Sequence, residues 1–301
     1  MTDSAHAIEV DGLVRRYGRT DAVNGLSLRV GRGRCYGFFG RNGAGKTTTI
    51  KCLLNLLRPT SGTVRVFGRD PAREEVAVKA RLAYVPDQVA FYPWMTVRGS
   101  LDYFASFRER WNVALEKELL DRFGLDVRKK TSHLSKGQRT QLALTTAICA
   151  EPDLLVLDEP TSGLDPILRR EFIETVIGAY QDGAPGRTVF VSTHLISEFE
   201  GLIDEFTIID GGRNVLTLEA DDARARYQRI TARFADLAPA IDLPGSRVLR
   251  RRDREIELLT TGDPGDVIGR LRSHPVETIA TEAMSLEEIF VSTVRSERVV
   301  A

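Results

Sequence analysis

One eight-residue segment combines three glycines, a lysine and a threonine at a spacing that suits phosphate. GRNGAGKT matches GxxxxGK[ST] in full, after an aromatic-rich predicted strand and before a predicted helix. Glycines let successive N–H groups turn inward around phosphate oxygens, and the start of a helix reinforces such an anion site. Lys46 is expected to reach the β and γ phosphates. The predicted nucleotide-binding residues here are Gly40, Arg41, Asn42, Gly43, Ala44, Gly45, Lys46, Thr47 and Thr48.

Two adjacent acids close a fully apolar run further along the chain. LLVLDE places Asp158 and Glu159 directly after residues 154–157, at the strand edge where open α/β sheets bind ligands. Asp158 and the Thr47 hydroxyl fit a Mg²⁺ site, and Glu159 fits a carboxylate that polarises water. Two acids capping the turn before Pro160 would be the simpler explanation, but the upstream phosphate loop favours catalysis.

A third motif, LSKGQ, ends at Gln138. Ser135 and Gln138 have the spacing of a helix capping box, which alone explains the pair. However, a phosphate loop, LSKGQ, LLVLDE, SGLD ending at Asp165, and then His194 follow in one order. In these motifs the chain closely resembles the ABC ATPase family over roughly residues 8–213.

The resemblance implies how the motifs work together. Two nucleotide-binding domains would close head to tail, with ATP between the phosphate loop of one and the LSKGQ of the other. Ser135, Lys136, Gly137 and Gln138 would therefore act in trans, and Asp165 would belong to the loop between the sites. His194 would contact the γ-phosphate and serve catalysis with Glu159 and Lys46, unless it is a structural histidine. Tyr17 would stack on adenine, unless it is a core tyrosine.

Two positions depart from the family's pattern. Lys136 replaces a glycine of LSGGQ, which removes a flexible position and adds a cation that is free to attract the nucleotide. The metal-contacting glutamine position falls on Asp87, with Gln88 beside it, so either residue is a candidate.

Short strands separated by helices must position these motifs. We predict strands over 8–14, 25–30, 33–40, 82–86, 154–157 and 188–192, and helices over 47–57 and 139–150. Residues 96–122 should be mostly helical. The expected fold is an α/β P-loop ABC ATPase domain: a mainly parallel core sheet, an antiparallel β-subdomain and a helical subdomain, plus a small C-terminal α/β domain.

The predicted boundaries are 1–214 for the ATPase domain, with its helical subdomain over about 89–150, and 215–301 for the accessory domain. Within the second, strands are expected at 230–234 and 255–259. Five arginines between residues 247 and 254 suit either phosphate binding or a solvated hairpin tip, and the interspersed acids favour the hairpin.

Composition sets limits on location and partners. The 42 basic and 42 acidic residues cancel, so no net charge favours nucleic acid, and no nucleic-acid partner is expected. Three unpaired cysteines suit a reducing compartment. There is neither a secretory leader nor a run of roughly 18 apolar residues. The prediction is a cytoplasmic protein, peripheral on the inner face of the cell membrane.

The tract FYPWMTV (91–97) and the C-terminal MSLEEIF (284–290) resemble the ATPases of ABC-2 type exporters. This implies ATP and Mg²⁺ as cofactors, an integral membrane permease as partner, and a homodimer or heterodimer of nucleotide-binding domains. The aromatic loop 91–94 suits a partner's coupling helix, or alternatively joins two subdomains. A soluble ABC ATPase acting on ribosomes or DNA, and a non-hydrolysing regulatory binder, are the competing interpretations.

Overall fold

In the computed structural model, which describes residues 4–181, 186–241 and 243–300, the chain forms two compact units. The first spans Met1–Thr217 and the second Leu218–Ala301. The sequence had suggested a division at 214, three residues earlier.

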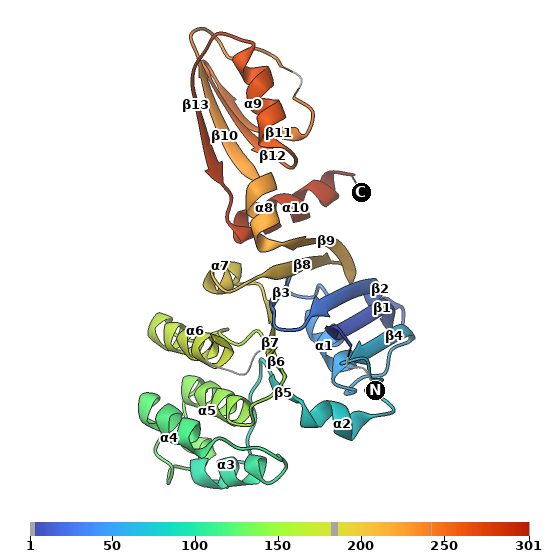
Figure 1. The fold of residues 1–301 in the computed structure, drawn as a ribbon, viewed down its shortest axis with the longest axis vertical. Coiled ribbons are helices and arrows are strands. Elements are labelled where there is room, and N and C mark those ends of the chain that lie inside the picture. Colours follow the sequence, from blue (N-terminus) through green and yellow to red (C-terminus); the bar gives the residue numbers. More distant parts are fainter. Residues whose placement is uncertain (1–3, 182–185, 242, 301) are drawn as a thin grey trace. The chain divides into compact units, whose positions relative to one another are not determined.

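A six-stranded sheet forms the centre of the first unit (Figure 1), in the order β5-β6-β7-β3-β8-β9. Its strands are β3 (Cys35–Gly40), β5 (Leu82–Val85), β6 (Leu154–Asp158), β7 (Thr188–Thr193), β8 (Glu205–Asp210) and β9 (Arg213–Glu219). The pairs from β5 through β8 are parallel. Every residue of β3, β6 and β7 is buried, as expected of strands covered on both faces. Their carboxyl ends therefore meet at one edge.

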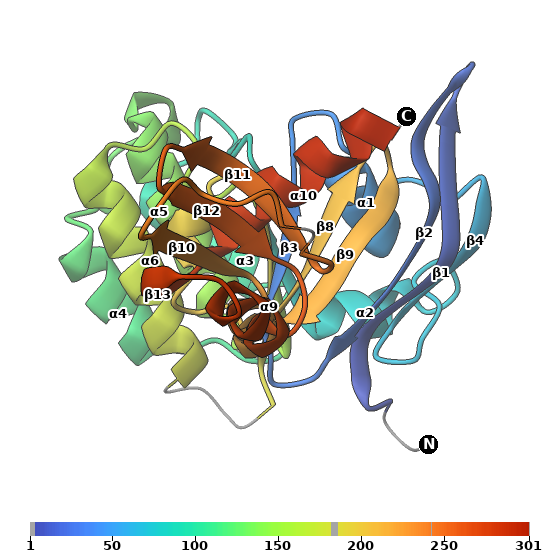
Figure 2. The ribbon, with the colours of Figure 1, turned by 90° about the horizontal axis from the view of Figure 1, so that it is seen from above.

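Three antiparallel strands form a separate sheet in the same unit, in the order β2-β1-β4 (Figure 2). These are β1 (His6–Tyr17), β2 (Thr20–Gly31) and β4 (Ser61–Val66). β1 and β2 extend beyond the predicted spans, because a tight turn at residues 18 and 19 joins them as one long hairpin.

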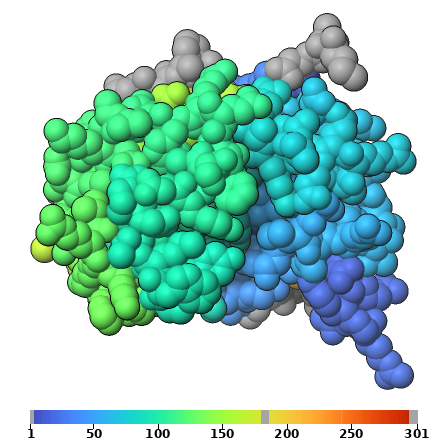
Figure 3. Space-filling view, turned by 90° about the horizontal axis from the view of Figure 1, so that it is seen from below, coloured from blue at the N-terminus to red at the C-terminus, as the bar shows by residue number. Residues whose placement is uncertain are grey.

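Helices of the first unit cover the sheets and build the helical subdomain. They are α1 (Lys46–Leu53), α2 (Glu75–Ala80), α3 (Val97–Ala105), α4 (Val113–Arg122), a 3₁₀ turn η1 (Thr131–His133), α5 (Lys136–Ile148), α6 (Pro166–Gln181) and α7 (Ile196–Phe199). The region predicted as mostly helical over 96–122 is two helices separated by residues 106–112. Viewed from below, the green helical subdomain and the blue-to-cyan part of the unit form two lobes with a hollow between them (Figure 3).

The end of α1 differs from the prediction, which extended the helix to Leu57. The helix stops at Leu53, and Asn55 adopts a left-handed backbone with φ of 55°. The N–H groups of Leu56 and Leu57 both turn back to the carbonyl of Lys51. Asparagine tolerates this conformation after a helix, so the stop comes from Asn55 and not from Pro59. Similarly, α5 begins at Lys136, three residues before the predicted start.

The second unit is an antiparallel sheet with helices. The sheet order is β11-β12-β10-β13, from β10 (Gln228–Phe234), β11 (Ser246–Arg252), β12 (Glu255–Thr260) and β13 (Val276–Ala283). Its helices are α8 (Ala220–Arg226), α9 (Pro264–Arg272) and α10 (Leu286–Val300). Side chains of β10, β12 and α9 share one buried apolar cluster. The arginine-rich segment is the exposed edge strand β11 and its hairpin turn, as the solvated alternative predicted.

The predicted fold class is confirmed: a mainly parallel core sheet, an antiparallel β-subdomain, a helical subdomain and a small C-terminal α/β unit. Cys35, Cys52 and Cys149 are buried free thiols. None of the described helices has both the length and the apolar composition that a membrane crossing needs.

Candidate functional site

The phosphate loop joins β3 to α1 and is shaped by close backbone contacts. Gly45, which precedes the first residue of α1, has φ of 104°, and a Cβ there would lie 2.4 Å from the carbonyl oxygen of Ala22 in β2. A Cβ on Gly40 would lie 2.8 Å from the carbonyl oxygen of Ile209 in β8. Both positions therefore require glycine. The loop is held between the core sheet and the antiparallel sheet.

Lys46, Glu159 and His194 form one cluster at the end of this loop. Lys46 is buried, and its Nζ lies 2.7 Å from the carbonyl oxygen of Gly40 and 2.8 Å from Oε1 of Glu159. The other carboxylate oxygen of Glu159, Oε2, lies 2.8 Å from Nδ1 of His194. A carboxylate only accepts, so Nδ1 of His194 donates this hydrogen bond. The structure thus brings together the three residues predicted to be catalytic.

The backbone of Glu159 is itself unusual, with φ of 48°. Its N–H donates to the carbonyl oxygen of Ser192 in β7 at 2.7 Å. Such left-handed geometry is uncommon for a residue other than glycine and is tolerated where surrounding contacts fix it. Here the turn after β6 directs the carboxylate toward Lys46 instead of along the strand.

Asp158 is fully buried at the carboxyl end of β6. Its Oδ1 accepts a hydrogen bond from the Ser192 hydroxyl at 3.0 Å, whereas Oδ2 has no hydrogen-bond partner among the described residues. Burial raises the pKa of Asp158, against the opposing effect of the hydroxyls of Thr47 and Ser192. A buried acceptor without a partner, beside the Thr47 hydroxyl, fits a hydrated Mg²⁺.

Tyr17 ends β1, and its side chain is 46% exposed. The guanidinium of Arg15 lies 4.7 Å from the centre of its ring, and Nη1 of Arg15 donates to the carbonyl oxygen of Arg58. One face of the tyrosine therefore carries a cation and the ring is partly open to solvent. The alternative of a buried core tyrosine is wrong for this position.

Asp87 and Gln88 follow β5 and differ in their surroundings. Asp87 is half-buried and Gln88 is exposed. Burial raises the pKa of Tyr84, and the charges of Asp158 and Asp87 raise it further. The charges of Asp87 and Asp158 therefore act on the same tyrosine.

The LSKGQ segment leads into α5, with Ser135 as the N-cap and Lys136 as the first helical residue. The Ser135 hydroxyl accepts from the N–H of Gln138 at 3.1 Å, and the Gln138 side chain accepts from the N–H of Ser135 at 3.2 Å. This is the predicted capping box. A Cβ on the buried Gly137 would lie 2.4 Å from Leu168 Cδ1 in α6. The capping bond leaves the hydroxyl hydrogen of Ser135 available to donate.

Asp165 directly precedes α6, and its side chain caps the start of that helix. Its Oδ1 accepts from the N–H groups of Ile167 and Leu168 at 3.0 and 3.1 Å. Arg169 in the same helix donates to the carbonyl oxygen of Leu164 and pairs with Glu198 of α7. The turn between Glu159 and α6 is thus fixed at its far end.

Three residues of this site were not singled out from the sequence: Ser192, Tyr84 and Arg15. Each is an ordinary residue of a strand or strand end, with no motif to mark it. The one available signal is position, because Tyr84 in β5 and Ser192 in β7 lie on the two strands that flank β6, which carries Asp158.

An exposed group of aromatic side chains lies elsewhere on the helical subdomain. Tyr92, Trp94, Tyr103, Phe104 and Phe107 are all at least 36% exposed, and Phe91 packs against Phe104. Tyr92 contacts Trp94 at 4.9 Å between ring centres and Tyr103 at 5.8 Å. We call these six residues the aromatic patch. It combines the predicted loop 91–94 with one side of α3 and the residues after it.

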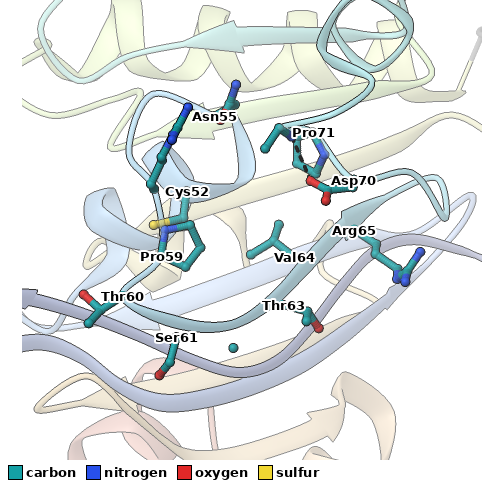
Figure 4. Close-up of a pocket in the computed structure, with 13 residues that line it drawn as sticks. Cys52, Asn55, Pro59, Thr60, Ser61, Thr63, Val64, Arg65, Asp70 and Pro71 are labelled. Carbon is teal, nitrogen blue, oxygen red and sulfur yellow. Dashed lines mark hydrogen bonds between the residues drawn. The ribbon is translucent and has the colours of Figure 1, made fainter.

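A cavity of about 490 Å³ between the end of α1 and β4 is separate from the phosphate-loop cluster (Figure 4). Its walls include Cys52, Asn55, Thr63 and Asp70. None of the predicted site residues lines it, so we assign it no part in the chemistry.

Comparison with known proteins agrees with this geometry. A family model described as "ABC transporter" matches residues 23–162. The chain is 34% identical to "Daunorubicin resistance ATP-binding protein DrrA3" of Streptomyces coeruleorubidus, over 97% of this chain and 96% of that protein. It is 36% identical to "Nod factor export ATP-binding protein I" of Ralstonia nicotianae, over 70% and 67%. A solved "ATP binding subunit of ABC transporter" superposes with a TM-score of 0.65 at 29% identity, covering 72% of this chain and 92% of that one.

Proposed function

The chain belongs to the ABC transporter ATPases, and from that premise we propose that it powers export through a separate integral membrane permease. The observation that carries the proposal is the cluster of Lys46, Glu159 and His194 at the mouth of the phosphate loop. It joins a phosphate-binding cation to a carboxylate of fixed orientation. A carboxylate held beside the phosphate-binding lysine is suited to polarise water for hydrolysis, which favours an ATPase over a non-hydrolysing regulatory binder.

In the proposed mechanism, Lys46 binds the β and γ phosphates together with the backbone N–H groups of residues 40–48. Glu159 orients and polarises the attacking water, and His194 holds Glu159 through its Nδ1 hydrogen bond. Catalysis is mainly positioning and electrostatic stabilisation. Tyr17 stacks on adenine by its face opposite Arg15.

Mg²⁺ would be held by the Thr47 hydroxyl and, through water, by Asp158. When bound, the ion neutralises charge on the phosphate oxygens. The partnerless Oδ2 of Asp158 supports this assignment. Asp87 is the better candidate for the position that senses the metal and couples it to the partner, because Asp87 is half-buried near Tyr84 and Gln88 is exposed.

Hydrolysis is proposed to need two nucleotide-binding domains, either two copies of this chain or this chain and a paralogue. Ser135, Lys136, Gly137 and Gln138 stand at the start of a 13-residue helix, where backbone N–H groups and the helix dipole favour an anion. They would complete the site of the opposing domain, with Asp165 in the loop between. ATP closes the pair and hydrolysis reopens it.

The aromatic patch is proposed as the contact with the permease, at the cytoplasmic face of the membrane. Clustered exposed Tyr, Trp and Phe side chains are typical of protein interfaces. The name of one relative includes export, which supports this direction of transport. Residues 1–214 would bind nucleotide and 215–301 would be an accessory domain.

The composite site is tested by the mass of the Glu159→Gln chain in solution with Mg-ATP. We expect the mass to double with ATP and to stay monomeric with ADP, and a second change, Ser135→Arg, to prevent doubling. A chain that binds ATP yet stays monomeric at every ATP concentration would contradict a composite site between two copies of this chain and leave only a pair with a paralogue.

A further inference from the structure

Lys136, the residue that departs from LSGGQ, contacts the loop that follows Glu159 in its own chain. Its Nζ donates to the carbonyl oxygen of Ser162 at 2.6 Å. A Cβ placed on Gly163 would lie 2.7 Å from Nζ and 3.6 Å from Cε of Lys136. The lysine side chain therefore lies directly on the Ser162–Gly163 peptide.

We propose that Lys136 is a positioning residue that ties the LSKGQ turn to the loop 159–165, so that the two composite ATP sites respond to each other. The proposal rests on the proposed function, because it requires LSKGQ to serve the opposing domain. Lys136, which replaces a glycine of LSGGQ, would thereby couple the two composite ATP sites.

The tether reaches Glu159 through two hydrogen bonds. Lys136 donates to the carbonyl of Ser162, and the N–H of Ser162 donates to the carbonyl oxygen of Glu159 at 3.1 Å. At the other end of the path, Ser135 precedes Lys136 directly. Ser135, which serves the opposing site, is thus linked to the backbone of Glu159, whose carboxylate serves the site of its own chain.

The other parts of the loop 159–165 are held by their own contacts, so a movement of Lys136 would act on Ser162 and Gly163 alone. Arg169 holds the carbonyl of Leu164, and the Thr161 hydroxyl donates to Glu198, which also pairs with Arg169. These contacts leave Ser162 and Gly163 as the part of the loop held by LSKGQ. Gly163 has φ of 70° and so suits glycine for its backbone as well as for the space that Lys136 occupies.

An alternative role, attraction of the opposing nucleotide, would use the same ammonium group. A lysine ammonium has three N–H donors, so it can donate to Ser162 and still attract a phosphate. Its charge alone therefore does not tell the two roles apart. The contact with Ser162 does, because only the tether requires the lysine to rest on Gly163. The two roles predict different results for substitutions at these positions.

The first test measures hydrogen–deuterium exchange of residues 159–168 in the full chain without nucleotide. We expect Lys136→Met to speed exchange there, Lys136→Arg to preserve protection, and Lys117→Met, which alters an exposed lysine of α4, to change nothing. Unchanged exchange in Lys136→Met would overturn the tether. This measurement does not depend on dimer formation.

The second test measures the ATP dependence of hydrolysis. We expect Lys136→Met to lower the Hill coefficient from about 2 toward about 1 and to reduce turnover about twofold to fivefold, as suits an exposed charged hydrogen bond, with Lys136→Arg restoring both. Faster exchange with an unchanged Hill coefficient would overturn the coupling role.

A double substitution separates the tether from nucleotide attraction. Gly163→Ala should reduce turnover more when residue 136 is lysine than in Lys136→Gly, because only lysine meets the new Cβ. Equal losses in both backgrounds would exclude the tether. If the Glu159→Gln chain fails to dimerise with ATP, the composite site between two copies of this chain fails, while the exchange measurement still decides whether the contact exists.

Discussion

At the scale of single residues, the charge of Glu159 is shared between two donors. Lys46 and His194 each lie 2.8 Å from one of its oxygens, so a phosphate that binds Lys46 must share the ammonium with this carboxylate. The chemistry and the nucleotide affinity of the site are therefore linked through one side chain.

Glu159→Gln should reduce turnover about 100-fold or more. It should also tighten ATP binding about threefold to tenfold, because the neutral amide no longer competes with phosphate for Lys46. Steady-state hydrolysis and calorimetric titration measure the two effects. Glu174→Gln, on the exposed side of α6, is the matched control. Normal turnover in Glu159→Gln would remove Glu159 from its catalytic role.

Tyr17→Ala should weaken ATP binding about tenfold, since stacking on a base contributes roughly 1–3 kcal/mol. Tyr17→Phe should bind normally. Arg15→Met should weaken ATP binding only about twofold to threefold, because the Arg15 cation covers the face of the Tyr17 ring opposite the adenine. Binding of inorganic tripolyphosphate, which lacks the base, should be the same in all of these variants, and an equal loss for tripolyphosphate would show that Tyr17 acts on the loop instead.

These residues show what the sequence alone makes available. Lys46, Glu159 and His194 lie in motifs whose order along the chain implies their neighbours, so their cluster is predictable from the sequence. Lys136 was predicted only as a loose attraction to nucleotide, because sequence does not reveal where a four-carbon side chain rests. Its partner Ser162 lies 26 positions away, in another turn.

At the scale of elements, one buried acid joins the helices of the helical subdomain. Glu116 in α4 accepts from Arg98 of α3 at 2.6 Å and from Nε1 of Trp111 at 2.7 Å. Burial opposes its ionisation, but these two donors outweigh that effect, and the pKa of Glu116 lies below its ordinary value. The charged form therefore stabilises the fold.

Glu116→Gln should lower the free energy of unfolding by about 1–2 kcal/mol at neutral pH. Because the folded pKa is lowered, the contribution of Glu116 is complete above its unfolded pKa of about 4.3 and is lost as the pH falls further. Denaturant titration at several pH values, followed by Trp111 fluorescence in a Trp94→Phe background, measures it. A difference between the two chains that persists unchanged at low pH would contradict the assignment.

The errors in predicted elements have local causes. Periodicity carried α1 to Leu57, but Asn55 turned the backbone left-handed four residues after Lys51. Hydrophobic patterning predicts only part of β1 and of β2, since the ends of both strands next to their shared turn are held by pairing in the hairpin. A pattern of residue types does not show strand pairing or the backbone conformation of a single residue, and these two features set the bounds of α1, β1 and β2.

At the scale of the whole molecule, every residue proposed to bind nucleotide within one chain lies in the first unit, Met1–Thr217. A chain ending after Glu219, the last residue of β9, should bind ATP with an affinity within about twofold of the full chain. Titration with circular dichroism as a folding control measures this. A folded truncation that no longer binds ATP would place part of the site in the second unit.

Affinity capture tests the proposal that this ATPase drives a membrane permease. The Glu159→Gln chain with Mg-ATP is used to recover partners from detergent-solubilised native membranes, and mass spectrometry identifies them. We expect to recover a multi-spanning membrane protein. Combining Trp94→Ala and Phe107→Ala, both in the aromatic patch, should reduce the amount of that protein recovered. Recovery of ribosomal or DNA-associated proteins with no membrane protein would contradict the proposal and favour a soluble ABC ATPase.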